Sequence, residues 1–196
     1  MSIKNLKNNK IYERKRLISK ILVVYLTGIL AIGTVVPPVL SDVADSWWNP
    51  AWNYRKLLTI NATQISGVLV DFPMLLQVSD SDVAAHAQTT GNDIVFILYS
   101  DNTTMLNHEI EYYNGATGMI CAWVNITRLS TTSNTKIWMY YGNPASSAQE
   151  DIIGTWNSNY VMVQHLNETG VILGDSTGYH NDGVSTGTNS TSMGKV

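Results

Sequence analysis

Cysteine is nearly absent from this sequence, since Cys121 is the only one among 196 residues. No disulfide can form within the chain, so its fold must be stabilised by a hydrophobic core. Histidine is also scarce, and the four residues show neither His-x-x-x-His nor Cys/His spacing. Zinc sites need such spacings. We therefore expect no metal site and no cofactor. We also expect no serine nucleophile, on the premise that no serine has a Gly-x-Ser-x-Gly context.

Basic residues are few, and most of them lie at the N-terminus. Seven of the twelve Lys and Arg precede an uncharged stretch, residues 21–40, with a single acid among them. Cations followed by an apolar segment are typical of a signal peptide or a membrane anchor. Twenty residues can span a bilayer, but Pro37-Pro38 would disrupt the last turn. A signal peptide cleaved near Ser41 or Ala44 and an uncleaved anchor both remain open.

Beyond residue 40 acidic side chains predominate. Five basic residues stand against fourteen acidic ones, so the net charge of this part is five minus fourteen, or −9. A chain this acidic lacks the basic surface with which proteins bind nucleic acid. With the leader ahead of it, this part is expected to be extracellular or at the cell surface. The membrane would be contacted through the N-terminal segment.

Five Asn-x-Ser/Thr motifs in the exported part are candidate glycan acceptors: Asn61, Asn102, Asn125, Asn167 and Asn189. A chain rich in Asn, Ser and Thr contains some of these motifs by chance. Behind an export leader they become plausible acceptors, provided that the organism glycosylates such sites. Asn125 ends an apolar run, so we expect it to be partly covered.

Short segments rich in β-branched and aromatic residues recur between clusters of Gly, Asn, Asp, Ser and Pro. They predict an all-β fold, an antiparallel β-sandwich of jelly-roll type, preceded by the hydrophobic signal or anchor helix. The expected strands are Tyr54–Ile60, Val68–Val78, Asp93–Leu98, Leu106–Tyr112, Gly118–Ile126, Thr135–Tyr141 and Tyr160–Leu166. Pro73 predicts an edge strand or a bulge. Short helical turns, each capped by a serine, are expected at Ser81–Ala87 and Ser146–Trp156.

Three tryptophans, Trp47, Trp48 and Trp52, are crowded together outside any expected strand. Exposed indole rings can stack on sugar rings, so these residues are candidate ligand-binding side chains. The alternative is that they cover one end of the sandwich.

Glu109 and Glu111 are two positions apart on an expected strand, so their carboxylates project from the same face, roughly 7 Å apart. This separation is compatible with the acid pair of a glycoside hydrolase. The same alternation is also the ordinary outer face of a half-buried strand. We therefore do not expect an enzyme. Asp175, Asn181 and Asp182 could ligate calcium at a loop, although turns use these residues more often for backbone reasons.

Six blocks resemble domain-of-unknown-function family 2341 (DUF2341) over residues 47–145. The blocks are Trp48–Lys56, Asp71–Pro73, Asn92–Phe96, His108–Glu111, Ala122–Val124 and Tyr140–Asn143. Two later blocks, Val163–Glu168 and Asp175–Gly178, resemble the opening of a concanavalin A-like or laminin G-like domain. Together with the leader in residues 1–44, which follows from the charge and apolar pattern, the resemblances imply the family's β-sandwich in 45–148 and a connector with an incomplete concanavalin A-like domain in 149–196.

The family resemblance implies exported, often multidomain surface proteins with adhesion-like or glycan-binding neighbours. We therefore expect an exported cell-surface module that is carbohydrate-binding or adhesive, with surface glycans or other surface proteins as partners. The alternative is a structural subunit of a surface layer or filament that assembles through sheet edges. A third reading is a carbohydrate-active enzyme that uses Glu109 and Glu111.

Overall fold

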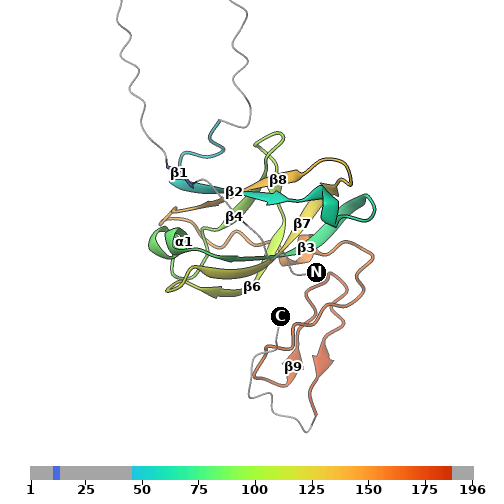
Figure 1. Cartoon of the computed structure of the whole chain (residues 1–196). Helices are drawn as coiled ribbons and strands as arrows, with labels where there is room; N and C mark the ends of the chain where they lie inside the picture. Colours follow the sequence, from blue (N-terminus) through green and yellow to red (C-terminus); the bar gives the residue numbers. More distant parts are fainter. Residues whose placement is uncertain (1–10, 14–45, 187–196) are drawn as a thin grey trace, which may run out of the picture.

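The computed structural model describes residues 11–13 and 46–186 (Figure 1). Nearly all of the expected leader in residues 1–44, with its signal or anchor helix, therefore lies outside the described residues. Among the described residues, no helix is long and apolar enough to cross a membrane.

Two antiparallel sheets form the two layers of a sandwich (Figure 1). The larger sheet has five strands in the order β1-β2-β8-β4-β5, and the smaller sheet has three in the order β3-β7-β6. The larger sheet consists of β1 (Ile11–Glu13), β2 (Tyr54–Ile60), β8 (Thr135–Tyr141), β4 (Val95–Leu98) and β5 (Met105–Leu106). The smaller sheet consists of β3 (Leu69–Ser79), β7 (Met119–Leu129) and β6 (His108–Asn114). The expected all-β class is confirmed.

The main core lies between the sheets and follows the alternation of side chains along each strand. In β8, Ile137, Met139 and Tyr141 face this core, whereas Trp138 and Tyr140 belong to a second apolar cluster on the outer face. All five are at most 2 % exposed. The strand lies between β2 and β4 in its sheet. The sequence pattern of this strand, apolar on both faces, is thus explained by a central strand that is covered on both sides.

Pro73 lies where the sequence indicated, and Gly118 has a role in a turn that the sequence analysis had not assigned to it. Pro73 lies in β3, an edge strand of the smaller sheet, and an edge position tolerates a residue without a backbone N–H. Residues 115–118 connect β6 to β7. Gly118 has φ +64°, and a Cβ there would clash with the backbone oxygen of Asp80. Only glycine fits this turn without strain.

The short helices are close to their expected positions, but their caps differ. Helix α1 (Ser81–His86) is capped by Asp80, and α2 (Ile152–Thr155) is capped by Asp151. The expected serine caps, Ser81 and Ser146, were therefore wrong. In both cases an aspartate side chain accepts a backbone N–H of the first turn, and its negative charge also suits the positive end of the helix. A 3-10 turn, η2 (Ala62–Gln64), precedes β3.

The C-terminal segment, residues 157–186, contains only a two-stranded ladder of β9 (Ile172–Leu173) and β10 (Gly183–Val184). Figure 1 shows that this ladder lies apart from the two sheets. The strand expected at Tyr160–Leu166 is not formed. Its backbone bonds elsewhere: Val163 N donates to the Asp175 carboxylate at 2.8 Å, and Leu166 has φ +57°. A β-rich composition alone does not supply a pairing partner.

Candidate functional site

The three candidate tryptophans lie on the outer face of the larger sheet. Trp52 is 6 % exposed, and its indole N–H donates to the Asp93 backbone oxygen at 2.6 Å. Trp47 is half-buried and donates to the backbone oxygen of Trp52 at 2.8 Å. The half-buried Trp48 ring packs on Trp52 with centroids 5.0 Å apart. These contacts are those of a cover over the sheet, and Trp52 has little surface left for a sugar ring.

The glycan acceptors differ in exposure. Asn61 and Asn167 are exposed. Asn102 is 2 % exposed, and its side-chain nitrogen donates to Ser46, so it is poorly placed to receive a glycan. Asn125 is half-buried beside α2, as its apolar neighbours indicated. Asn189 lies outside the described residues.

Glu109 and Glu111 face the C-terminal segment, which places a histidine between them. His165 Nε2 lies 3.2 Å from Glu109 Oε1, and His165 Nδ1 lies 3.4 Å from Glu111 Oε2. The first contact has ion-pair distance but poor hydrogen-bond alignment. Two indoles complete this Glu–His cluster: Trp156 donates to Glu109, and Trp123 donates to Glu111, each at 2.7 Å.

The Glu–His cluster stabilises opposite charges in a partly dehydrated site. The contact with Glu109 raises the pKa of His165 against the effect of burial, and Glu111 adds to the rise. Burial opposes ionisation of Glu109, but contacts from His165, Ser176 and Trp156 outweigh it and lower the pKa of Glu109. A carboxylic acid that acts as a general acid requires a raised pKa, whereas the pKa of Glu109 is lowered. A general base must have a free lone pair, whereas the oxygens of Glu109 already accept hydrogen bonds from Trp156 and Ser176. The cluster has the properties of an ionic anchor for the C-terminal segment.

Ser176 belongs to the same cluster and was missed in the sequence. Its hydroxyl donates to Glu109 Oε1 at 2.7 Å. Gly174-Asp175-Ser176-Thr177-Gly178 has the spacing Gly-x-Ser-x-Gly, so the expectation that no serine has this context overlooked a segment that is present. In hydrolases this motif sits on a strand-to-helix turn. Here no helix follows the serine within the described residues. Its hydroxyl donates to a carboxylate and has no hydrogen bond to a histidine in the described part of the chain.

Asp175 holds the loop around Ser176. Its carboxylate accepts hydrogen bonds from the backbone N–H groups of Val163, Thr177 and Asn181, and from the Thr177 hydroxyl. These donors outweigh the effect of burial and lower the pKa of Asp175. The backbone therefore uses the oxygens that could have bound calcium. Within residues 11–13 and 46–186, no group of three His, Cys, Asp or Glu is arranged to hold a metal ion.

A further group of charged residues attaches α1 to the larger sheet. The buried Lys56 ammonium pairs with Asp80, and burial lowers the pKa of Lys56. The hydroxyl of Tyr141 donates to Asp82, which also lies 3.1 Å from Nδ1 of His86. Burial, followed by the bond to Asp82, raises the pKa of Tyr141. As in the Glu–His cluster, the partners are supplied by the protein itself.

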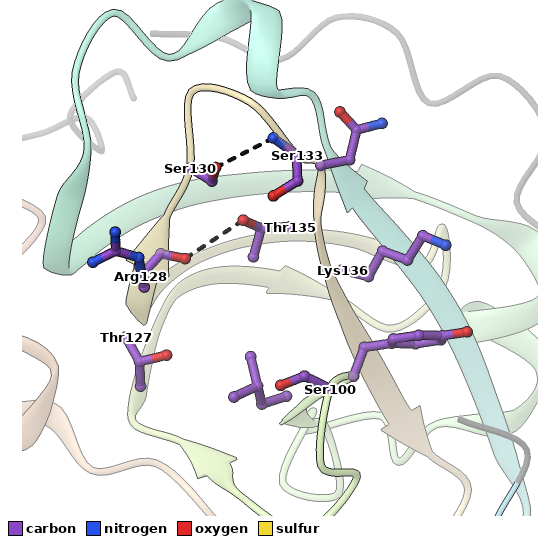
Figure 2. Close-up of a pocket in the computed structure, with 10 residues that line it drawn as sticks. Ser100, Thr127, Arg128, Ser130, Ser133, Thr135 and Lys136 are labelled. Carbon is purple, nitrogen blue, oxygen red and sulfur yellow. Dashed lines mark hydrogen bonds between the residues drawn. The ribbon is translucent and has the colours of Figure 1, made fainter. Parts of the chain in front are cut away.

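A pocket of about 500 Å³ opens at one end of the sandwich. It is formed where β4 ends, where β7 ends and where β8 begins, so both sheets contribute to it. Most of the residues that line it have uncharged polar side chains: Ser100, Thr127, Ser130, Ser133, Asn134 and Thr135. Figure 2 shows Arg128 and Lys136 on opposite sides of this pocket, with Thr135 between them. We call it the polar pocket.

The loop that shapes the polar pocket is held by its own hydrogen bonds. Ser130 Oγ accepts the backbone N–H groups of Thr132 and Ser133 at 3.1 and 3.2 Å, and the latter bond is drawn in Figure 2. Asn134 Oδ1 accepts the backbone N–H of Ala62 at 2.9 Å. The carbonyl of that amide is therefore used to fix the loop, while its NH2 group has no bond within the described part of the chain. A pocket with fixed walls loses less entropy on binding.

Tyr99 forms one wall of the polar pocket. Its half-buried ring packs on Trp138 with centroids 5.6 Å apart. The ammonium of Lys136 lies 5.0 Å from the centroid of the Tyr99 ring. This aromatic side chain was not among the sequence candidates, because it follows β4 in a polar turn and has no distinctive motif.

These observations define the class of protein: an antiparallel β-sandwich whose C-terminal segment is held to the smaller sheet by buried charges. A family model described as "Domain of unknown function (DUF2341)" matches residues 90–192, which is just over half of the chain. The chain belongs to this family. No curated protein and no solved structure matches it.

The family match places the pocket residues and the Glu–His cluster within one family domain. It runs from the residues before β4 through the C-terminal segment. It therefore includes much of residues 149–196, which were expected to begin a concanavalin A-like domain. The comparisons do not show that second domain, and the division at residue 148 stays a prediction. The expected resemblance to DUF2341 itself is confirmed.

Proposed function

We propose that this chain is a carbohydrate-binding module of an exported surface protein, and that the polar pocket is its binding site. The observation that carries the proposal is a pocket of saccharide size whose walls are hydroxyl and amide side chains beside one aromatic ring. Ligand sites in proteins generally have volumes of about 300–1,000 Å³. Nine of the ten lining residues carry a hydroxyl, amide or charged group, which favours a ligand rich in hydroxyl groups.

The side chains that line the pocket carry chemical groups that can bind the hydroxyl and C–H groups of a sugar. Ser and Thr hydroxyls both donate and accept hydrogen bonds, as sugar hydroxyls do. Among the described residues, the hydroxyls of Ser100 and Thr127 have no hydrogen-bond partner, although both line the pocket. Tyr99 also lines the pocket, and aromatic rings can pack against the C–H groups of a sugar ring. These unused donors and acceptors distinguish the polar pocket from the Glu–His cluster.

The alternative, a structural subunit that assembles through sheet edges, finds less support at the edge strand β3. Assembly through edges needs a straight strand with free backbone groups. In the edge strand β3, Pro73 lacks an N–H, and Asp71 has φ +47°. Such features interrupt a regular ladder. We therefore favour binding over polymerisation for this surface, and the export of the module remains part of the proposal.

A glycan array tests the proposal directly. Wild-type protein should bind a subset of glycans, and Tyr99→Ala should abolish that binding. The double variant Ser100→Ala/Thr127→Val, which removes two hydroxyls with little change in volume, should weaken it roughly tenfold. Tyr179→Ala is the matched control, because Tyr179 is an exposed tyrosine in the C-terminal segment. The proposal fails if the wild type binds no glycan, or if the double variant binds as the wild type does.

A further inference from the structure

The polar pocket has a charge opposite to that of the rest of the described chain. Residues 46–186 contain twelve Asp and Glu but only four Lys and Arg. Two of these cations, Arg55 and Lys56, are 2 % and 3 % exposed. The other two, Arg128 and Lys136, are exposed, and both line the polar pocket. The accessible positive side chains of this region are therefore concentrated at one site.

Neither pocket cation is paired with a carboxylate in the part of the chain that the structure describes. Arg128 and Lys136 form no ion pair with a carboxylate among residues 11–13 and 46–186, whereas the buried Lys56 pairs with Asp80. The ammonium of Lys136 lies over the Tyr99 ring, at 5.0 Å from its centroid. Cations that are held beside a pocket without a carboxylate are available to an anionic ligand.

We infer that the ligand of the polar pocket is an anionic saccharide that carries carboxylate or sulfate groups. This inference rests on the proposed saccharide site and adds the class of ligand. The guanidinium of Arg128 can bind such a group through two parallel hydrogen bonds, and Lys136 acts as a point charge. Because the two cations stand on opposite sides of the pocket (Figure 2), a chain of sugar units with repeated charges can contact both.

The acidic residues outside the pocket should increase its selectivity for anionic saccharides over other polyanions. The part of the chain beyond residue 40 has five basic and fourteen acidic residues, so it repels polyanions in general. An anion must gain its affinity within the pocket itself, where hydroxyl groups and Tyr99 also contact the sugar. A polyanion without sugar rings has the charge but lacks these contacts, and it should bind weakly.

The test uses four polymers of matched length: dextran, carboxymethyl-dextran, dextran sulfate and poly-glutamate. The first three share one backbone and differ in charge, and the last has charge without sugar. Isothermal titration calorimetry at low and physiological salt should show tightest binding to one of the two charged dextrans. The better of the two identifies carboxylate or sulfate as the preferred group. Binding should weaken with added salt.

Charge variants locate the binding. Arg128→Gln and Lys136→Gln should each weaken binding of the preferred charged dextran roughly tenfold, which corresponds to one charge-assisted hydrogen bond. Lys136→Arg keeps the charge and should retain most of the affinity. Circular dichroism and thermal melts of each variant show whether the fold is unchanged. Because both residues are exposed, these variants should fold as the wild type does.

The outcomes separate this inference from the proposed function. Equal binding of dextran and the charged dextrans, or unchanged affinity in both Gln variants, would overturn the anionic class and leave a saccharide site standing. Binding of poly-glutamate as tight as that of the charged dextrans would overturn the saccharide site itself. No binding of any polymer, together with an empty glycan array, would overturn both.

Discussion

Two charged regions of this molecule differ in where their partners come from. In the Glu–His cluster, Glu109, Glu111 and His165 neutralise each other, and their side chains are 9 to 13 % exposed. In the polar pocket, Arg128 and Lys136 are exposed and have no carboxylate partner in the described structure. The pair of glutamates looks more catalytic in the sequence, yet its charges are already satisfied. This difference is the reason why the polar pocket, rather than the glutamate pair, is proposed as the binding site.

The largest effect should come from breaking the Glu–His cluster. Glu109→Ala leaves the His165 imidazole with Glu111 as its remaining carboxylate partner. It also leaves the indole N–H of Trp156 and the Ser176 hydroxyl without the carboxylate that accepts their hydrogen bonds. Removal of one partner of a buried ion pair costs about 3 kcal/mol or more of unfolding free energy. Urea denaturation followed by tryptophan fluorescence measures this loss.

The matched control for this substitution is Asp71→Asn. Asp71 is an exposed carboxylate with φ +47°, a conformation that asparagine also tolerates. Its unfolding free energy should stay within about 0.5 kcal/mol of the wild type. If Glu109→Ala changes the unfolding free energy as little as Asp71→Asn does, the cluster does not anchor the C-terminal segment, and the comparison between the two regions fails.

A smaller effect is expected from Trp156→Phe. This change keeps an aromatic side chain, although phenyl is smaller than indole, and removes the N–H that donates to Glu109 at 2.7 Å. A hydrogen bond to a charged group contributes about 1.5 kcal/mol or somewhat more. Trp48→Phe is the control, since the Trp48 indole nitrogen has no hydrogen bond among the described residues. Chemical denaturation should rank Trp156→Phe as the less stable variant, and the reverse order would count against the anchor.

The pH dependence of stability tests the charges of the cluster. The pKa of His165 is raised, so its stabilising effect is complete below the ordinary value of 6.5 and is lost as the pH rises through the raised pKa. The pKa of Glu109 is lowered, so its effect is complete above the ordinary value of 4.5 and is lost as the pH falls through the lowered pKa. The melting temperature should therefore be highest between these limits.

Two variants test whether His165 causes the fall in melting temperature at alkaline pH. His165→Gln should melt at a lower temperature than the wild type near pH 6 and should lose the decline above it. The control His180→Asn replaces an exposed histidine with φ +52° by a residue that accepts this conformation, and it should keep the decline. An identical profile in His165→Gln would show that the imidazole does not carry the charge. Differential scanning fluorimetry from pH 4 to 9 is sufficient.

The smallest effect on stability should come from the polar pocket. Arg128→Gln and Lys136→Gln remove exposed charges without leaving a buried partner, so the unfolding free energy should change by less than about 0.5 kcal/mol. A large loss in thermal melts would mean that these cations are structural, and the two regions would then be alike.

Local pattern predicted much of the fold. The bounds expected for β2 and β8 agree with the structure at both ends, and the Pro73 strand lies at an edge. Alternation of apolar residues determines which face of a strand is buried, and this signal needs no knowledge of distant parts. The predictions of secondary structure failed where the backbone forms hydrogen bonds with residues that are not its neighbours in the sequence. The segment at residues 160–166 has strand composition, but its backbone donates to the Asp175 side chain.

The candidate site was predicted less well. Glu109 and Glu111 were identified as neighbours on one face, but the histidine between them comes from a segment far along the chain. Ser176 lies 67 positions from Glu109, and its Gly-x-Ser-x-Gly context was present but unrecognised. The polar pocket had no motif at all, because its residues come from three separate strand ends and are common types.

By itself, the sequence determined the class of fold, the family and the excess of acidic side chains, since alternation, short motif blocks and charge are properties of neighbouring residues. Only the tertiary structure decided which charges are neutralised. Packing of the two sheets brings the ends of β4, β7 and β8 together, leaving Arg128 and Lys136 exposed there. The C-terminal segment places His165 between two glutamates, and such long-range approaches depend on packing rather than on local preference.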